Sequence, residues 1–211
     1  SIVSDVSNGT TSLTDSTITY TPDGDWNGID TFTYKANDGT DDSNTSTITV
    51  VVDNVNDVPT MLGTSSGNGY TENDQSTDED VAFDIDLSSF LTDADDTDTI
   101  TYTISSDVSN GTTSLSGSVL TYTSDTNYNG TDSFTWYAND GLVDSSDGKI
   151  NITINSVNDA PTTEDVSTTI NENRYIASLS SITLLGSDVE GDDLTYSLVT
   201  DPSNGTASID G

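Results

Sequence analysis

A repeat with a period of 102 residues constrains the fold of this chain more than any other feature. The segment Asp5–Leu13, Asp-Val-Ser-Asn-Gly-Thr-Thr-Ser-Leu, returns unchanged as Asp107–Leu115. Three further pairs of motifs have the same offset, namely Trp26-Asn27-Gly28 with Tyr128-Asn129-Gly130, Ala36–Gly39 with Ala138–Gly141, and Val55–Thr60 with Val157–Thr162. Because the offset is constant, no insertion separates these motifs, and the chain is predicted to be a tandem array of one domain.

The array is out of phase with the ends of the chain. A third, partial copy is visible where Leu194–Leu198 matches Ile100–Ile104. The chain begins at Ser1, without an initiator methionine or the apolar core of a signal peptide. We therefore expect a fragment of a longer array, divided into the later part of one repeat, a complete repeat and the early part of a third, at residues 1–56, 57–158 and 159–211.

The apolar residues within each repeat follow the pattern of β-strands. Segments such as Ile48–Val52, Ser133–Ala138 and Lys149–Ile154 alternate apolar and polar residues and are rich in β-branched and aromatic side chains. Clusters of Gly, Asn and Asp separate these segments, and no stretch has helical periodicity. We therefore predict an all-β fold, although a composition with only 30% hydrophobic residues would otherwise suggest disorder.

A period of about 102 residues matches the size of a two-sheet β-sandwich. In the middle repeat we expect about seven strands, near residues 81–86, 99–105, 112–115, 118–123, 126–129, 132–138 and 147–155. Residues 60–78, rich in Gly and Ser, are expected to be a linker. The side chains expected in the core are Phe83, Ile85, Leu87, Ile100, Tyr102, Ile104, Leu115, Leu120, Tyr122, Phe134, Trp136, Ala138, Ile150, Ile152 and Ile154.

The charge of the chain excludes several classes of function. There are 37 Asp and Glu residues against 3 Lys and Arg, which gives a formal net charge of −34, and there is no His or Cys. Nucleic acids and anionic membranes would be repelled, and chemistry that needs His or Cys is excluded. No apolar run is long enough for membrane insertion. Carboxylate pairs recur with the repeat, whereas a glycosidase pair would occur once, so we expect no enzyme activity.

The acidic residues gather where one repeat meets the next. Three or more carboxylates within about 5 Å repel by roughly 3 kcal/mol per pair at an effective dielectric constant of about 20. Calcium, which takes six to eight oxygen ligands and tolerates irregular geometry, would remove this repulsion. Isolated acids such as Asp41 are interpreted as a solvated surface, and Asp38 and Asp140 as turn formers. The clusters are Asp53–Asp57, Asp78–Asp80 and Asp93–Asp96, then Asn158-Asp159, Glu172-Asn173 and Asp188–Asp193.

The segment Asn54–Pro59, Asn-Val-Asn-Asp-Val-Pro, resembles the Asp-x-Asn-Asp-x-x-Pro joint of cadherins, shortened by one residue and with Asn in place of the leading Asp. The chain is similar to the cadherin-like tandem repeats of large bacterial surface adhesins of the RTX type. This resemblance implies tandem cadherin-like or Ig-like, seven-stranded Greek-key β-sandwiches whose joints hold calcium ions.

The resemblance also implies the calcium ligands. At the first joint these would be Asn56, Asp57, Glu79, Asp93 and Asp95, and at the second Asn158, Asp159, Glu172, Asp188 and Glu190. Glu72, which lies in the long segment after Pro59, is an alternative to Glu79.

The favoured function is a calcium-stiffened stalk segment of an extracellular, cell-surface adhesin that supports cell adhesion or biofilm attachment. Its partners would be the neighbouring repeats of the same chain, with a glycan or a homophilic cell-surface partner as a further candidate. Two alternatives stay open. One is a component of an extracellular matrix or filament that assembles through calcium-bridged repeats. The other is a module that recognises a glycan or a partner domain, in which the non-repeated residues 60–78 would make the contact.

Overall fold

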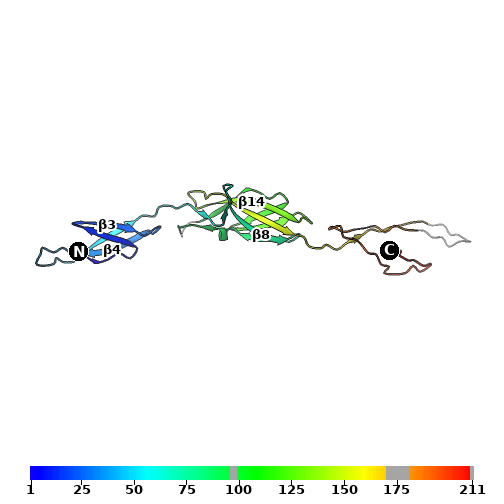
Figure 1. Cartoon of the computed structure of the whole chain (residues 1–211), viewed down its shortest axis with the longest axis horizontal. Coiled ribbons are helices and arrows are strands. Elements are labelled where there is room, and N and C mark those ends of the chain that lie inside the picture. The colour runs from blue at the N-terminus through cyan, green and yellow to red at the C-terminus, as the bar shows by residue number, and fades with distance from the viewer. Residues whose placement is uncertain (96–98, 170–180, 210–211) are drawn as a thin grey trace, which may run out of the picture.

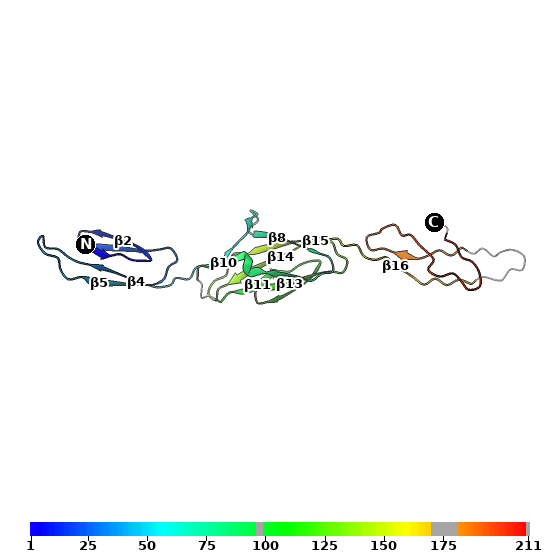
Figure 2. The same ribbon diagram turned by 90° about the horizontal axis from the view of Figure 1, so that it is seen from below.

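The computed structural model describes residues 1–95, 99–169 and 181–209, which lie as three segments along one long axis (Figures 1 and 2). The regular structure of these residues consists of strands and one short 3-10 helix, η1 (Leu87–Phe90). The predicted all-β fold is confirmed. Within these ranges, no helix has the length and apolar character needed to cross a membrane.

The middle segment contains a complete two-sheet domain. A five-stranded sheet has the order β11-β14-β15-β8-β7, and a three-stranded sheet has the order β12-β13-β9. Strands β10 and β6 form a short separate pair. In chain order the strands are β6 (Thr60–Met61), β7 (Thr64–Ser65), β8 (Thr71–Asp78), β9 (Phe83–Asp86), β10 (Leu91–Thr92), β11 (Thr101–Ser106), β12 (Gly111–Ser116), β13 (Val119–Ser124), β14 (Gly130–Asn139) and β15 (Gly148–Asn155).

Two of the strand predictions for this repeat were wrong. Strand β8 lies in the segment expected to be a linker, and it pairs in parallel with β15 along its whole length, from Thr71 opposite Gly148 to Asp78 opposite Asn155. Its sequence, Thr-Glu-Asn-Asp-Gln-Ser-Thr-Asp, has no apolar residue, so pairing with β15 outweighs its weak intrinsic preference for a strand. Conversely, residues 126–129 form a turn that leads into β14.

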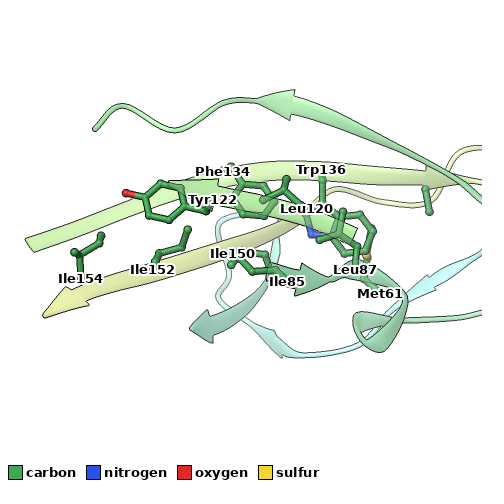
Figure 3. Close-up of a cluster of buried hydrophobic side chains, with 11 residues drawn as sticks. Met61, Ile85, Leu87, Leu120, Tyr122, Phe134, Trp136, Ile150, Ile152 and Ile154 are labelled. Atoms are coloured by element: carbon green, nitrogen blue, oxygen red, sulfur yellow. The ribbon is translucent and has the colours of Figure 1, made fainter. Parts of the chain in front are cut away.

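The core lies between the two sheets, and the prediction of its members is confirmed. Every side chain expected there is either buried in the hydrophobic cluster or packed against it. Figure 3 shows the buried side chains in one continuous row along the strands. Met61, Phe90, Leu91, Val108 and Tyr128 also contribute, although the alternating pattern did not indicate them.

The first segment repeats the later strands of the middle domain. It contains β1 (Ile2–Ser4), β2 (Gly9–Thr14), β3 (Thr17–Pro22), β4 (Gly28–Tyr34) and β5 (Ser46–Val52), in a sheet of order β1-β4-β5 and a β2-β3 hairpin. The described part of the third segment contains the short antiparallel pair of β16 (Thr162–Thr163) and β17 (Gly186–Ser187). Tyr34 is 38% exposed, whereas its counterpart Trp136 is 1% exposed, because this first segment has no strands that match β8 and β9.

We expect Leu120→Ala to destabilise the middle domain by about 2–5 kcal/mol, because the side chain is fully buried and its removal leaves a cavity. The matched control is Leu142→Ala, whose side chain is 78% exposed and whose effect should stay within about 0.5 kcal/mol. Denaturant unfolding of the whole chain, followed by tryptophan fluorescence, measures both. Equal effects of the two variants would contradict the described core.

Candidate metal centres at the repeat joints

The first joint is held by hydrogen bonds between the linker after β5 and the loops of the middle domain. The Asp57 amide donates to Asp95 Oδ2 at 2.8 Å, and the Asp95 amide donates to Asp93 Oδ1 at 3.0 Å. The structure therefore brings three of the predicted ligands together. Asn56 lies at the same joint, where its Nδ2 donates to Asp140 Oδ2 at 2.8 Å.

Negative charge is concentrated at this joint, where three other carboxylates act on that of Asp57. Burial, followed by the charges of Asp25, Asp95 and Asp93, raises the pKa of Asp57 above its usual value. Asp93 Oδ2 is buried, and among the described residues it has no hydrogen-bond partner. A buried carboxylate oxygen without a donor is costly unless a cation or water contacts it.

Asp140 is a joint residue that the sequence interpretation took only for a turn former. It is 5% exposed, and its Oδ1 accepts bonds from the Leu142 and Val143 amides, both at 2.7 Å, as expected for a turn. Its Oδ2 faces the linker and accepts the bond from Asn56. These donors, the Val143 amide first, lower the pKa of Asp140. The repeated Ala-Asn-Asp-Gly motif was visible in the sequence, but nothing in it indicated contact with the linker.

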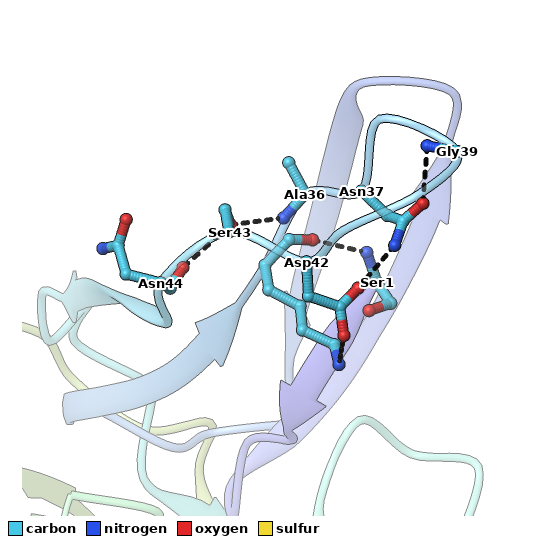
Figure 4. A network of polar contacts seen from close by, with 8 residues as sticks. Ser1, Ala36, Asn37, Gly39, Asp42, Ser43 and Asn44 are labelled. Atoms are coloured by element: carbon cyan, nitrogen blue, oxygen red, sulfur yellow. Dashed lines mark hydrogen bonds and ion pairs between the residues drawn. The ribbon is translucent and has the colours of Figure 1, made fainter.

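The same turn occurs in the first repeat (Figure 4). Asn37 Oδ1 accepts the Gly39 amide at 2.7 Å, and Asn37 Nδ2 donates to Asp42 Oδ1 at 2.8 Å. Asp42 is also paired with Lys35, whose backbone oxygen accepts a bond from the Ser1 amino group at 2.8 Å. The loop geometry that presents Asp140 to the linker is therefore encoded locally, by the Asn-Asp-Gly sequence.

Glu79 lies at the second joint, and its assignment to the first joint was wrong. Its amide donates to Asn155 O at 3.0 Å, and its Oε1 accepts the Val157 amide at 2.6 Å. Strand β8 causes this placement, because it runs parallel to β15 and both strands end at the same end of the domain. Glu79 is 3% exposed, and its Oε2 has no partner among the described residues. The alternative ligand, Glu72, lies near the start of β8, beside Asn151.

The second joint repeats the bonds of the first. The Asp159 amide donates to Glu190 Oε1 at 3.2 Å, and the Glu190 amide donates to Asp188 Oδ1 at 3.1 Å. Asn158 Nδ2 donates to the Asp159 carbonyl at 2.8 Å, as Asn56 Nδ2 does to the Asp57 carbonyl at 3.0 Å. Three of the predicted ligands thus come together here as well. Of the other two, Asn158 lies beside Asp159, and Glu172 lies outside the described residues.

Asn127 and Asp80 complete the second joint, and the sequence analysis identified neither as a site residue. The Asn127 amide donates to Asp80 Oδ1 at 3.0 Å. Its side-chain nitrogen lies 3.2 Å from Asp80 Oδ2 and 3.2 Å from Asp159 Oδ2, in the amide orientation that satisfies the local hydrogen bonds. For Asp80 the signal was its place in the Asp78–Asp80 cluster, and for Asn127 it was the change from Asp25 between the two repeats.

The donor set suits a hard cation. It consists of carboxylates, Asn side chains and linker carbonyls, and buried oxygens of Asp93 and Glu79 are available to an ion. Within residues 1–95, 99–169 and 181–209, no three acidic side chains are close enough to hold a metal ion by themselves. An ion would therefore have to draw carboxylates together or use carbonyl and water oxygens as further ligands.

In protein treated with a chelator, we expect the pKa of Asp57 to lie above the usual value for Asp and that of Asp140 to lie below it. Titration followed by ¹³C NMR of the carboxyl groups measures both. The raised pKa means that the folded form binds a proton at Asp57 more readily, so the contribution of Asp57 to stability falls as pH rises through that pKa. The lowered pKa of Asp140 makes its contribution fall as pH decreases. At neutral pH, Asp57→Asn should raise the unfolding free energy and Asp140→Asn should lower it. Changes of the same sign would contradict the described charges.

Comparison with known proteins assigns the repeats of this chain to a family. The family model described as bacterial Ig domain matches residues 1–51, 56–153 and 158–211. No curated protein matches the chain. The match covers nearly the whole sequence and includes the strands of both sheets of the middle domain.

Solved structures that match parts of this chain include two protocadherins and one hydrolase. The EC1-2 fragment of human mucin-like protocadherin is 14% identical, with a TM-score of 0.48 over 72% of this chain and 84% of that chain. The EC3-6 cis-dimer of protocadherin gammaB7 is 14% identical, with a TM-score of 0.43 over 89% of this chain and 51% of that chain. The endo-fucoidan hydrolase MfFcnA9, of glycoside hydrolase family 107, is 21% identical, with a TM-score of 0.31 over 69% of this chain and 26% of that chain. The family match confirms the expectation of tandem Ig-like repeats, and the chain belongs to the bacterial Ig domain family.

Proposed function

We propose that this chain is a stalk segment of an extracellular, cell-surface adhesin, in which calcium ions stiffen the joints between repeats. The observation that carries the proposal is the pair of equivalent joints. At each one, a linker amide bonds to an acidic side chain of the following repeat, Asp95 at the first joint and Glu190 at the second. Bacterial Ig repeats are typically extracellular, non-catalytic modules, which fits a structural role at the cell surface.

Calcium would act on the repulsion between the carboxylates. The charges of Asp25, Asp95 and Asp93 repel that of Asp57 at the first joint, which favours separation of the linker from the loops. A bound divalent ion reverses the sign of this effect and favours one interdomain angle. At the first joint the ion would contact Asp93 Oδ2 and at the second Glu79 Oε2, since both oxygens are buried without a partner in the described part of the chain.

The recognition alternative has a narrower basis than the sequence suggested. Residues 71–78, which were expected to belong to the linker, form strand β8 within the five-stranded sheet. The loop between β7 and β8 is the remaining non-repeated surface of this segment. A glycan or a homophilic partner therefore enters the proposal as the ligand of the whole adhesin, and the neighbouring repeats are the partners of this segment.

Calcium added to the chelator-treated chain should bind with dissociation constants on the order of 0.1–1 mM, as in other extracellular modules. Calorimetric titration measures the affinity and stoichiometry, and small-angle scattering measures the distribution of interatomic distances. We expect calcium to sharpen that distribution by restricting the interdomain angles.

Asp93→Asn should weaken binding at the first joint about tenfold, and Glu79→Gln should do the same at the second, because each removes one charged ligand. The matched control is Asp41→Asn, which removes the same charge from an exposed loop. No calcium binding, or equal losses in all three variants, would refute the proposal.

A further inference from the structure

Both joints place one side chain of the preceding repeat opposite the linker carboxylate. This side chain is a carboxylate at the first joint and an amide at the second. Positions 25 and 127 are equivalent, since the repeat offset of 102 residues also relates Asp57 to Asp159. At the first joint the group is Asp25, whose negative charge acts on Asp57. At the second joint it is Asn127, whose amide nitrogen lies 3.2 Å from Asp159 Oδ2.

The backbone is the same at positions 25 and 127, so the side chain there is one difference between the joints. A second difference is that Glu79 and Asp80 contribute to the second joint alone, because their counterparts 102 residues earlier would precede Ser1. Asp25 and Asn127 both have left-handed backbone angles, with φ of 57° and 56°. Asn and Asp tolerate this conformation better than other non-glycine residues do, so either can occupy either site without added strain. Exchanging them changes one charge and one pair of donors.

Asn127 connects two acidic residues that lie in different parts of the second joint. In the amide orientation that satisfies its hydrogen bonds, the side-chain nitrogen donates to Asp80 Oδ2, from the middle repeat, and to Asp159 Oδ2, from the linker, both at 3.2 Å. Its backbone amide fixes the other Asp80 oxygen at 3.0 Å. An amide carries two N–H donors, so one side chain can bridge both carboxylates.

We propose that the Asn127 amide takes the place of a cation between Asp80 and Asp159, so that the second joint keeps its geometry at calcium concentrations at which the first joint has loosened. The calcium dependence of the first joint rests on the function proposed above, whereas the amide bridge does not. At the second joint, the buried Oε2 of Glu79, which has no partner among the described residues, is available to an ion. The counterpart of Asp25 is the neutral Asn127, which supplies no carboxylate there. Because ligand charge tunes calcium affinity, we expect the second joint of the Asn127→Asp variant to bind calcium about tenfold more tightly than that of the wild type.

Spin-label distances across each joint test this inference, and the absence of cysteine from the chain allows label pairs to be introduced cleanly. Thr49→Cys with Thr103→Cys reports on the first joint, and Thr103→Cys with Thr163→Cys reports on the second; all three positions are exposed. In excess chelator, the distance distribution of the wild-type chain should be broad across the first joint and narrow across the second. Equal broadening of both joints would overturn the inference.

The exchange variants assign the effect to one side chain. In chelator, Asn127→Asp should broaden the distance distribution across the second joint, and added calcium should narrow that distribution again. Asp25→Asn removes one carboxylate from the first joint and should raise the calcium concentration at the midpoint of its narrowing about tenfold. The control Asn129→Asp adds the same charge at an exposed position two residues away and should leave the second joint narrow.

The two proposals fail in different ways. If calcium narrows neither joint in any variant, the calcium-stiffened stalk is refuted, and the comparison of Asn127→Asp with wild type in chelator still decides whether the amide holds the second joint. If calcium narrows both joints but Asn127→Asp behaves like wild type in chelator, the stalk stands and the role of Asn127 is refuted.

Discussion

The contact between repeats has one kind of hydrogen bond in common at both joints, from a linker backbone amide to a carboxylate of the next repeat. Asp57 makes it to Asp95 at 2.8 Å, and Asp159 makes it to Glu190 at 3.2 Å. A charged acceptor strengthens such a bond and fixes its direction. The same bond also brings the carboxylate of the linker residue close to that of its acceptor. The hydrogen bond that orients the joint therefore also concentrates negative charge there. A counterion or an amide donor is needed to balance that charge.

The middle domain links its two joints through a pair of parallel strands. Strands β8 and β15 are hydrogen-bonded along eight residues and end together, at Asp78 and Asn155. Glu79 follows β8 directly and bonds to the backbone around Val157, so the linker leaves the domain in a fixed direction. A packed sandwich changes shape little when its surface loops move. Variation in the shape of the array is accordingly expected to come from the linkers, where a change of one charge has most effect.

The repeat register made much of the joint predictable. The pairing of Asp57 with Asp95, and of Asp159 with Glu190, follows once the acidic motifs are aligned, because they recur in the same order in each repeat. The placement of Glu79 could not be derived in the same way. It depends on β8, a strand without apolar residues, and a pattern of hydrophobic alternation cannot detect such a strand.

Two other joint residues were missed for different physical reasons. Asp140 satisfies its own turn with one oxygen and contacts Asn56 with the other, so its local role accounted for its position in the sequence. Asn127 is neutral, and a search for carboxylate clusters passes over it. Its importance comes from the two carboxylates that the fold places beside it, Asp80 and Asp159.

The distribution of charge also favours contacts between the ends of repeats over contacts between their sides. Beyond its short pairing with β7, strand β8 carries Asp74 and Asp78 along the margin of the sheet, where charged residues discourage pairing with a second chain. Asn151 donates to Asp74 at 3.0 Å and Asn155 donates to Asp78 at 3.1 Å, so these two carboxylates already have partners. The buried oxygens without partners lie at the joints instead, on Asp93 and Glu79. A cation gains more by binding at the ends of a repeat than along its side, which favours a stiffened linear array over a laterally bridged filament.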